Sequence, residues 1–167
     1  LYDHDGSIRL LVYTLERAIR EMEDGVEKVV LCIDMVGYSI SNAPPFKTSK
    51  MTLWILQNMY VERLHRALIF EPGWAFATFW SAISIFIDPV TKNKIVMVKD
   101  KKLEDKQARM LEHVGDPDQL CVEFGGRLES PYRREAMDEY WDADEAHYEA
   151  AREAAGGHPE ERDEDDQ

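Results

Sequence analysis

The feature that most constrains the fold is an alternation between continuous apolar runs and segments with helical periodicity. The apolar runs are residues 28–34 (KVVLCID), 66–70 (RALIF) and 94–98 (KIVMV), and the helical patterns cover residues 8–22, 48–60 and 103–114. A strand that is apolar at nearly every position needs cover on both faces, which is typical of a parallel sheet. We therefore predict an α/β fold, with a mostly parallel sheet and helices packed on it.

The end of the chain differs in pattern from the rest. Residues 120–124 (LCVEF) predict a last short strand before the turn at Gly125 and Gly126. Residues 135–155 predict a surface helix with Tyr140, Trp141 and Tyr148 on part of one face. We expect one α/β domain over residues 1–130, a helical extension over 131–155 and an acidic disordered tail over 156–167.

Charge is concentrated in that tail. The chain has a net charge of −13, but residues 138–167 alone hold 13 acidic and 2 basic residues. Residues 1–137 hold 20 acidic and 18 basic residues and are nearly neutral. A nearly neutral body can approach an anionic membrane where its basic groups cluster, whereas the tail opposes nucleic acid. We expect no nucleic-acid partner.

The two cysteines, Cys32 and Cys121, have no CxxC spacing, which is typical of reduced thiols in a cytosolic protein. No N-terminal signal pattern is visible. The longest uncharged stretch, residues 72–87, is shorter than the roughly 20 residues of a membrane-spanning helix. We expect a cytoplasmic protein.

Motifs of catalysis and of metal binding are missing from the sequence. There is no GxSxG elbow, phosphate-binding loop, GxGxxG motif or HExxH motif. The five histidines are scattered, without cysteine or carboxylate partners at ligand spacing. The sequence therefore predicts a protein that is not an enzyme and has neither a metal site nor a cofactor.

Residues 74–87 (WAFATFWSAISIFI) predict a helix that is apolar on nearly every side and must be covered on every side. One interpretation is a core helix between the sheet and other helices. The other is a gate with one face over a cavity and the other facing a membrane. An acyl chain of about sixteen carbons needs about 12 kcal/mol of apolar contact to leave a bilayer. Aromatic walls can provide it, through Trp74, Phe76, Phe79, Trp80 and Phe86.

The next segment, residues 88–94 (DPVTKNK), places two lysines and the Thr91 hydroxyl before a buried strand. A phosphate bound here would meet lysine charge and a hydroxyl hydrogen bond. The alternative is an ordinary solvated turn.

In order and spacing, these stretches resemble the CRAL-TRIO family, most of all its phosphatidylinositol transfer proteins. The resemblance is carried by residues 29–44 (VVLCIDMVGYSISNAP), 55–80 (ILQNMYVERLHRALIFEPGWAFATFW), 86–95 (FIDPVTKNKI) and 122–126 (VEFGG). It covers about residues 8–127, the C-terminal part of the family's domain, and the family's small helical lobe and early strands are not found. It implies a sheet floor, a mobile apolar gate helix and a cavity for one hydrophobic ligand.

The resemblance also implies roles for individual residues. Glu62 matches the acid of a Tyr-Pro-Glu-Arg motif, and Thr91 and Lys94 match an Asp-Pro-Val-Thr-x-x-Lys motif. Glu62 would accept inositol hydroxyls, Thr91 would donate to the phosphate and Lys94 would neutralise it. Without the resemblance, Glu62 reads as a surface acid paired with Arg63. The expected cavity and gate residues are Trp74, Phe76, Phe79, Trp80, Ile83, Phe86 and Ile87.

The sequence departs from the family pattern at several positions. Val61, Gly73 and Ile85 stand where relatives have prolines, so we expect softer gate boundaries. Val29 and Leu31 are apolar where carriers of both inositol and choline lipids have hydroxyl groups, which argues against phosphatidylcholine binding by that route.

We therefore predict non-catalytic binding and intermembrane transfer of a phospholipid, preferably phosphatidylinositol. The carrier would be a monomer that touches membranes transiently. The alternative is a degenerate scaffold module that exchanges no lipid and contacts a protein through the acidic tail or the helix with Tyr140 and Trp141.

Overall fold

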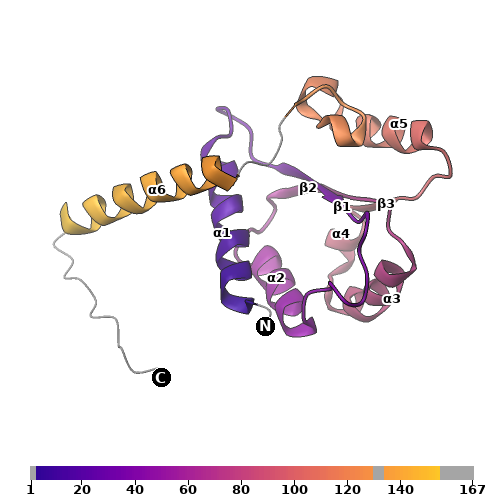
Figure 1. Cartoon of the computed structure of the whole chain (residues 1–167), viewed down its shortest axis with the longest axis horizontal. Coiled ribbons are helices and arrows are strands. Elements are labelled where there is room, and N and C mark those ends of the chain that lie inside the picture. The colour runs from indigo at the N-terminus through magenta and orange to yellow at the C-terminus, as the bar shows by residue number, and fades with distance from the viewer. Residues whose placement is uncertain (1–2, 130–133, 155–167) are drawn as a thin grey trace. The chain divides into compact units, whose positions relative to one another are not determined.

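The structure, a computed structural model, describes residues 3–129 and 134–154. The chain forms two compact units, Leu1–Glu129 and Ser130–Gln167. In the first unit, β1 (Val29–Asp34), β2 (Leu64–Phe70) and β3 (Ile95–Val98) form a sheet in the order β1-β2-β3 (Figure 1). Both pairings are parallel, which confirms the predicted α/β architecture.

Helices connect and cover the strands. Before and between them lie α1 (His4–Arg20), α2 (Phe46–Asn58), α3 (Trp74–Ile83), the 3₁₀ turn η1 (Ser84–Phe86) and α4 (Pro89–Lys92). After β3 come α5 (Leu103–Val114) and the 3₁₀ turns η2 (Pro117–Gln119) and η3 (Val122–Phe124). No helix in the described residues is long and apolar enough to cross a membrane.

The two faces of the sheet pack differently, because successive side chains of a strand point to opposite faces. On one face, Leu68, Phe70 and Val98 form a tight core with Met110 of α5 and Leu120. The other face carries Leu31, Ile33, Ala67, Ile69 and Ile95, which point toward α1, α2 and α3 and line a cavity. The continuous apolar pattern of the strands thus has two causes, one for each face.

Residues 74–87, which we call the gate segment after the expectation from the sequence, do not form one helix. Helix α3 ends at Ile83, and Ser84–Phe86 form a 3₁₀ turn. Pro89 follows closely and disfavours a helical conformation at Asp88, which is extended. Asp88 instead caps α4, accepting a hydrogen bond from the Thr91 N–H at 2.9 Å. The predicted turn over residues 88–94 therefore contains one turn of helix.

The predicted strand over residues 120–124 is wrong. Only an isolated bridge joins Cys121 to Leu128, and Val122–Phe124 form a 3₁₀ turn. The chain reverses tightly at Gly126, where a Cβ would lie 1.8 Å from the Leu120 carbonyl oxygen. The reversal packs the Phe124 ring edge-on against Phe70, with centroids 5.3 Å apart. These apolar residues therefore complete the core without extending the sheet.

The second unit contains α6 (Arg134–Ala154), close to the helix expected over residues 135–155. Tyr140 and Trp141 are exposed on it. The side chain of Tyr148 and residues 155–167, on which the expected tail falls, lie outside the described residues.

Candidate functional site

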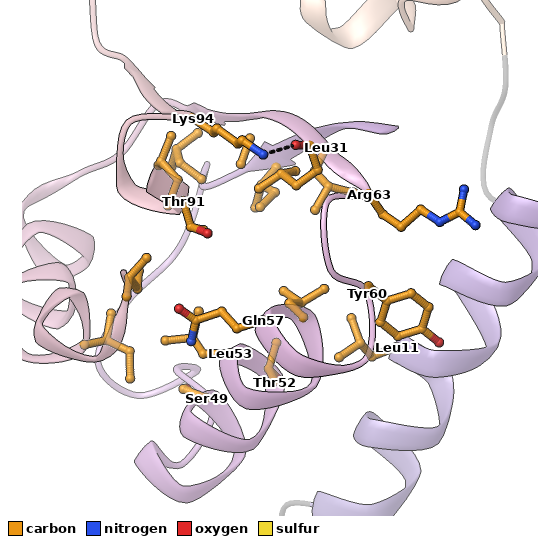
Figure 2. A pocket seen from close by; sticks show the side chains of 18 of the residues that line it. Leu11, Leu31, Ser49, Thr52, Leu53, Gln57, Tyr60, Arg63, Thr91 and Lys94 are labelled. Carbon is orange, nitrogen blue, oxygen red and sulfur yellow. Dashed lines mark hydrogen bonds between the residues drawn. The ribbon is translucent and has the colours of Figure 1, made fainter. Parts of the chain in front are cut away.

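A cavity of about 760 Å³ lies between the second face of the sheet and the helices α1, α2, α3 and α4 (Figure 2). Its volume falls within the range of about 300–1,000 Å³ that is usual for ligand sites. The strands provide an apolar floor, and α1 contributes Leu11 and Leu15 to a wall. The cavity thus presents a mainly hydrocarbon surface to whatever it holds.

The gate segment forms another wall. Phe76, Ile83 and Ile87 are buried against the cavity, and Phe79 and Trp80 line it half-buried. Two expected residues do not line it, because Trp74 is 74% exposed and Phe86 is 41% exposed. The segment therefore has one face over a hollow and the other in solvent. This arrangement does not fit a core helix covered on all sides.

Charged side chains gather where the strands begin. Lys28 precedes β1, Glu62 and Arg63 precede β2, and Lys94 precedes β3, and all four line the cavity. Because parallel strands begin at the same edge of a sheet, residues that are far apart in the chain share this edge. The cavity therefore has an apolar interior and a polar rim.

Thr91 lies at this rim in α4, and Lys94 lies there just before β3. The Lys94 ammonium donates a hydrogen bond to the Leu64 carbonyl oxygen at 2.8 Å, drawn as a dashed line in Figure 2. The Thr91 hydroxyl points into the cavity in the same view. Hydrogen bonds from the side chain and backbone of Thr91 hold the pKa of the Asp88 carboxyl below its usual value. Asp88 therefore stays ionised and holds α4 in place.

Glu62 sits in a turn with a positive φ of 64°, which L-residues rarely adopt. Its side chain is exposed at the rim. Within the described residues no ion pair joins it to Arg63, whose guanidinium donates to the Glu27 carbonyl oxygen at 3.1 Å. The Glu62 carboxylate is therefore available to a ligand.

Sequence reasoning missed two polar residues of the cavity wall, Gln57 and Tyr60. The Gln57 amide donates to the Phe86 carbonyl oxygen at 3.2 Å and accepts from the Asp88 N–H at 3.1 Å. The Tyr60 hydroxyl donates to Glu16 of α1 at 2.7 Å. Helical spacing was the available signal, because Gln57 shares a face of α2 with Leu53 and Leu56, and Tyr60 continues the same spacing two residues after the helix ends.

A parallel sheet that packs against a helix on one face and lines a cavity with the other defines the chain as an α/β domain with an internal pocket. The chain belongs to the CRAL/TRIO domain family, whose model matches residues 2–126. This confirms the resemblance seen in the sequence.

The chain is also similar to individual proteins from yeasts and a plant. The chain is 39% identical over 134 residues to a CRAL-TRIO domain-containing protein of Schizosaccharomyces pombe, covering 80% of this chain and 12% of that protein. It is 30% identical over 139 residues to a phosphatidylinositol transfer protein of Saccharomyces cerevisiae, covering 80% and 36%. It is also 30% identical over 145 residues to a phosphatidylinositol/phosphatidylcholine transfer protein of Arabidopsis thaliana, covering 73% and 23%. The chain thus spans between 12% and 36% of the length of these relatives.

Proposed function

We propose that this chain forms the lipid-holding cavity of a protein that binds a phospholipid, preferably phosphatidylinositol, and moves it between membranes. The observation that carries the proposal is a single hollow with an apolar floor, an apolar gate wall and a charged rim. This combination matches an amphipathic ligand with hydrocarbon tails and a polar head. The names of the yeast and plant relatives agree with it.

The apolar floor and gate wall of the cavity would hold the acyl chains of the lipid. Transferring an acyl chain of about sixteen carbons out of a bilayer costs about 12 kcal/mol unless equivalent contact replaces the lost hydrocarbon. The floor residues and the aromatic rings of the gate provide that contact. The Phe76 and Trp80 rings are stacked with centroids 6.2 Å apart, so the wall they form is continuous.

The charged rim of the cavity would bind the lipid headgroup. The Lys94 ammonium would exchange its bond to the neutral Leu64 carbonyl for a bond to the anionic lipid phosphate, which is stronger because both partners are charged. The Thr91 hydroxyl would exchange its hydrogen bond to the Asp88 carboxylate for one to the phosphate, and Glu62 would accept hydrogen bonds from inositol hydroxyls. Val29 and Leu31 line the cavity without a hydroxyl group, so they offer no polar contact to a choline lipid.

Lipid analysis of the full-length protein tests the proposal. Protein exposed to mixed phospholipid vesicles and repurified should carry phosphatidylinositol in excess over its share in the vesicles, as measured by mass spectrometry. Lys94→Ala should lower that occupancy about tenfold or more, because a hydrogen bond to a charged group contributes about 1.5–3 kcal/mol.

Lys92→Ala is the matched control. Lys92 carries the same charge two residues away, is exposed and does not line the cavity, so its loss should leave occupancy nearly unchanged. Protein that retains no lipid, or equal losses in both variants, would contradict the proposal. The absence of lipid together with a stably copurifying protein would favour the scaffold alternative.

A further inference from the structure

The outward face of α2 is unusual for a surface helix. Phe46, Met51 and Trp54 are 45%, 39% and 55% exposed, although the opposite face of α2 already lines the cavity. Together with Lys47 and Lys50 they border a shallow groove. A helix with apolar side chains on both faces should be covered on both, and no described residue covers this groove.

Phe86 of the gate's 3₁₀ turn extends this surface. Its ring lies 6.0 Å from the Phe46 ring, centroid to centroid, and the Lys50 ammonium lies 4.6 Å from its centroid. A cation this close to a ring face is attracted by it, so Lys50 is held beside exposed aromatic surface. We call Phe46, Lys47, Lys50, Met51, Trp54 and Phe86 the basic aromatic face.

The charge of this face is opposite to that of the chain. Residues 46–61 contain two lysines and no carboxylate, and residues 72–87 contain no charge, in a chain of net charge −13. Among the described residues neither Lys47 nor Lys50 forms an ion pair. The face therefore combines exposed aromatic and aliphatic groups with uncompensated positive charge.

We propose that the basic aromatic face docks on an anionic lipid bilayer. Lysines attract anionic headgroups, and tryptophan and phenylalanine side chains insert at the boundary between headgroups and acyl chains. The inference rests on the proposed function, since docking here places the gate, which shares Phe86 with this face, next to the lipid to be exchanged.

Vesicle flotation of the full-length protein tests the docking. Phosphatidylcholine vesicles containing phosphatidylserine should bind it more strongly than pure phosphatidylcholine vesicles, and the difference should shrink at high salt. The double variant Lys47→Gln/Lys50→Gln should bind the anionic vesicles about 30-fold more weakly. Trp54→Ala should weaken binding to both kinds of vesicle, because it removes the inserted ring.

Lys101→Gln/Lys102→Gln is the control. It removes the same charge from exposed lysines that precede α5, the helix packed on the other face of the sheet, and should leave vesicle binding within about twofold. Equal losses in both double variants, or none in either, would overturn the proposal. So would self-association that Trp54→Ala abolishes, since it would make the occupant a second copy.

The docking proposal and the carrier proposal can be refuted independently of each other. Lipid occupancy by mass spectrometry should be the same in the Lys47→Gln/Lys50→Gln variant as in wild type, because neither lysine lines the cavity. Loss of vesicle binding with normal occupancy supports the docking face. Lipid-free wild-type protein whose vesicle binding still depends on these lysines would refute the carrier function and leave the docking face standing.

Discussion

The Tyr60 side chain joins two helices of the cavity wall, since its hydroxyl, close to the C-terminal end of α2, donates to Glu16 of α1. Burial, together with the hydrogen bond and the negative charge of Glu16, raises the pKa of Tyr60 from 10.0 to about 12. The folded protein thus holds this proton more tightly than the unfolded chain does.

This linkage predicts a pH dependence. The contribution of Tyr60 to stability should be complete below pH 10 and should be lost as the pH rises to about 12. In urea denaturation over this range, the free energy of unfolding of wild type should fall more steeply than that of Tyr60→Phe. Glu16→Gln should also flatten the curve, because it removes the negative acceptor. Parallel curves for wild type and Tyr60→Phe would refute the linkage.

At the scale of elements, the gate is held at both ends. Before it, Glu71 has a positive φ of 53° and its carboxylate pairs with the nearly buried Lys106 of α5. Behind it, the Gln57 amide of α2 bonds the backbone of Phe86 and Asp88. Opening of the gate is therefore expected to require these contacts at its two ends to break.

Removing the second anchor should loosen the gate. Gln57→Ala deletes two hydrogen bonds of about 0.5–1.5 kcal/mol each, so amide exchange at Asp88 should rise about tenfold or more, as measured by hydrogen exchange. Transfer between vesicles should become faster where gate opening limits it.

Asn58→Ala is the matched control, because the Asn58 amide bonds only the Trp54 carbonyl within α2. Its exchange at Asp88 should match wild type. An unchanged exchange rate in Gln57→Ala would show that Gln57 does not anchor the gate.

At the scale of the whole molecule, one face of the sheet packs in the core and the other lines the cavity. Leu68 is fully buried in the core with α5, whereas its neighbour Ile69 faces the cavity. Of two adjacent residues in one strand, one therefore contributes to the packed core and the other to the cavity wall.

Substitutions at these neighbours should have different effects. Leu68→Ala should lower the free energy of unfolding by about 2–5 kcal/mol, because it leaves a void in a tight core. Ile69→Ala should cost less, because its side chain already borders a hollow. Ile69→Trp should reduce lipid occupancy by filling that hollow. Denaturation and mass spectrometry measure the two effects, and equal destabilisation by both alanine variants would contradict the division.

The local pattern of residues was sufficient to predict the three strands, the parallel sheet and most helices, because apolar continuity and helical periodicity are properties of neighbouring residues. It also drew attention to residues 74–87 and to Lys94. The helix stop after Ile83 was missed because it depends on competing local preferences around Ser84 and Pro89. The predicted strand over residues 120–124 was wrong because the chain reverses there, with Gly126 close to Leu120, and this contact exists only in the folded chain.

Other properties emerged only in the tertiary structure. Whether Leu68 or Ile69 faces the hollow depends on which side α5 occupies, and an all-apolar strand does not reveal this. The existence of the cavity depends on how far α1 and α2 stand from the sheet. The anchoring of the gate by Gln57 depends on contacts across 31 residues of chain. The pattern of residues along the chain shows periodicity and burial. A cavity depends instead on the distance between elements that are far apart in the chain, so only the tertiary structure determines it.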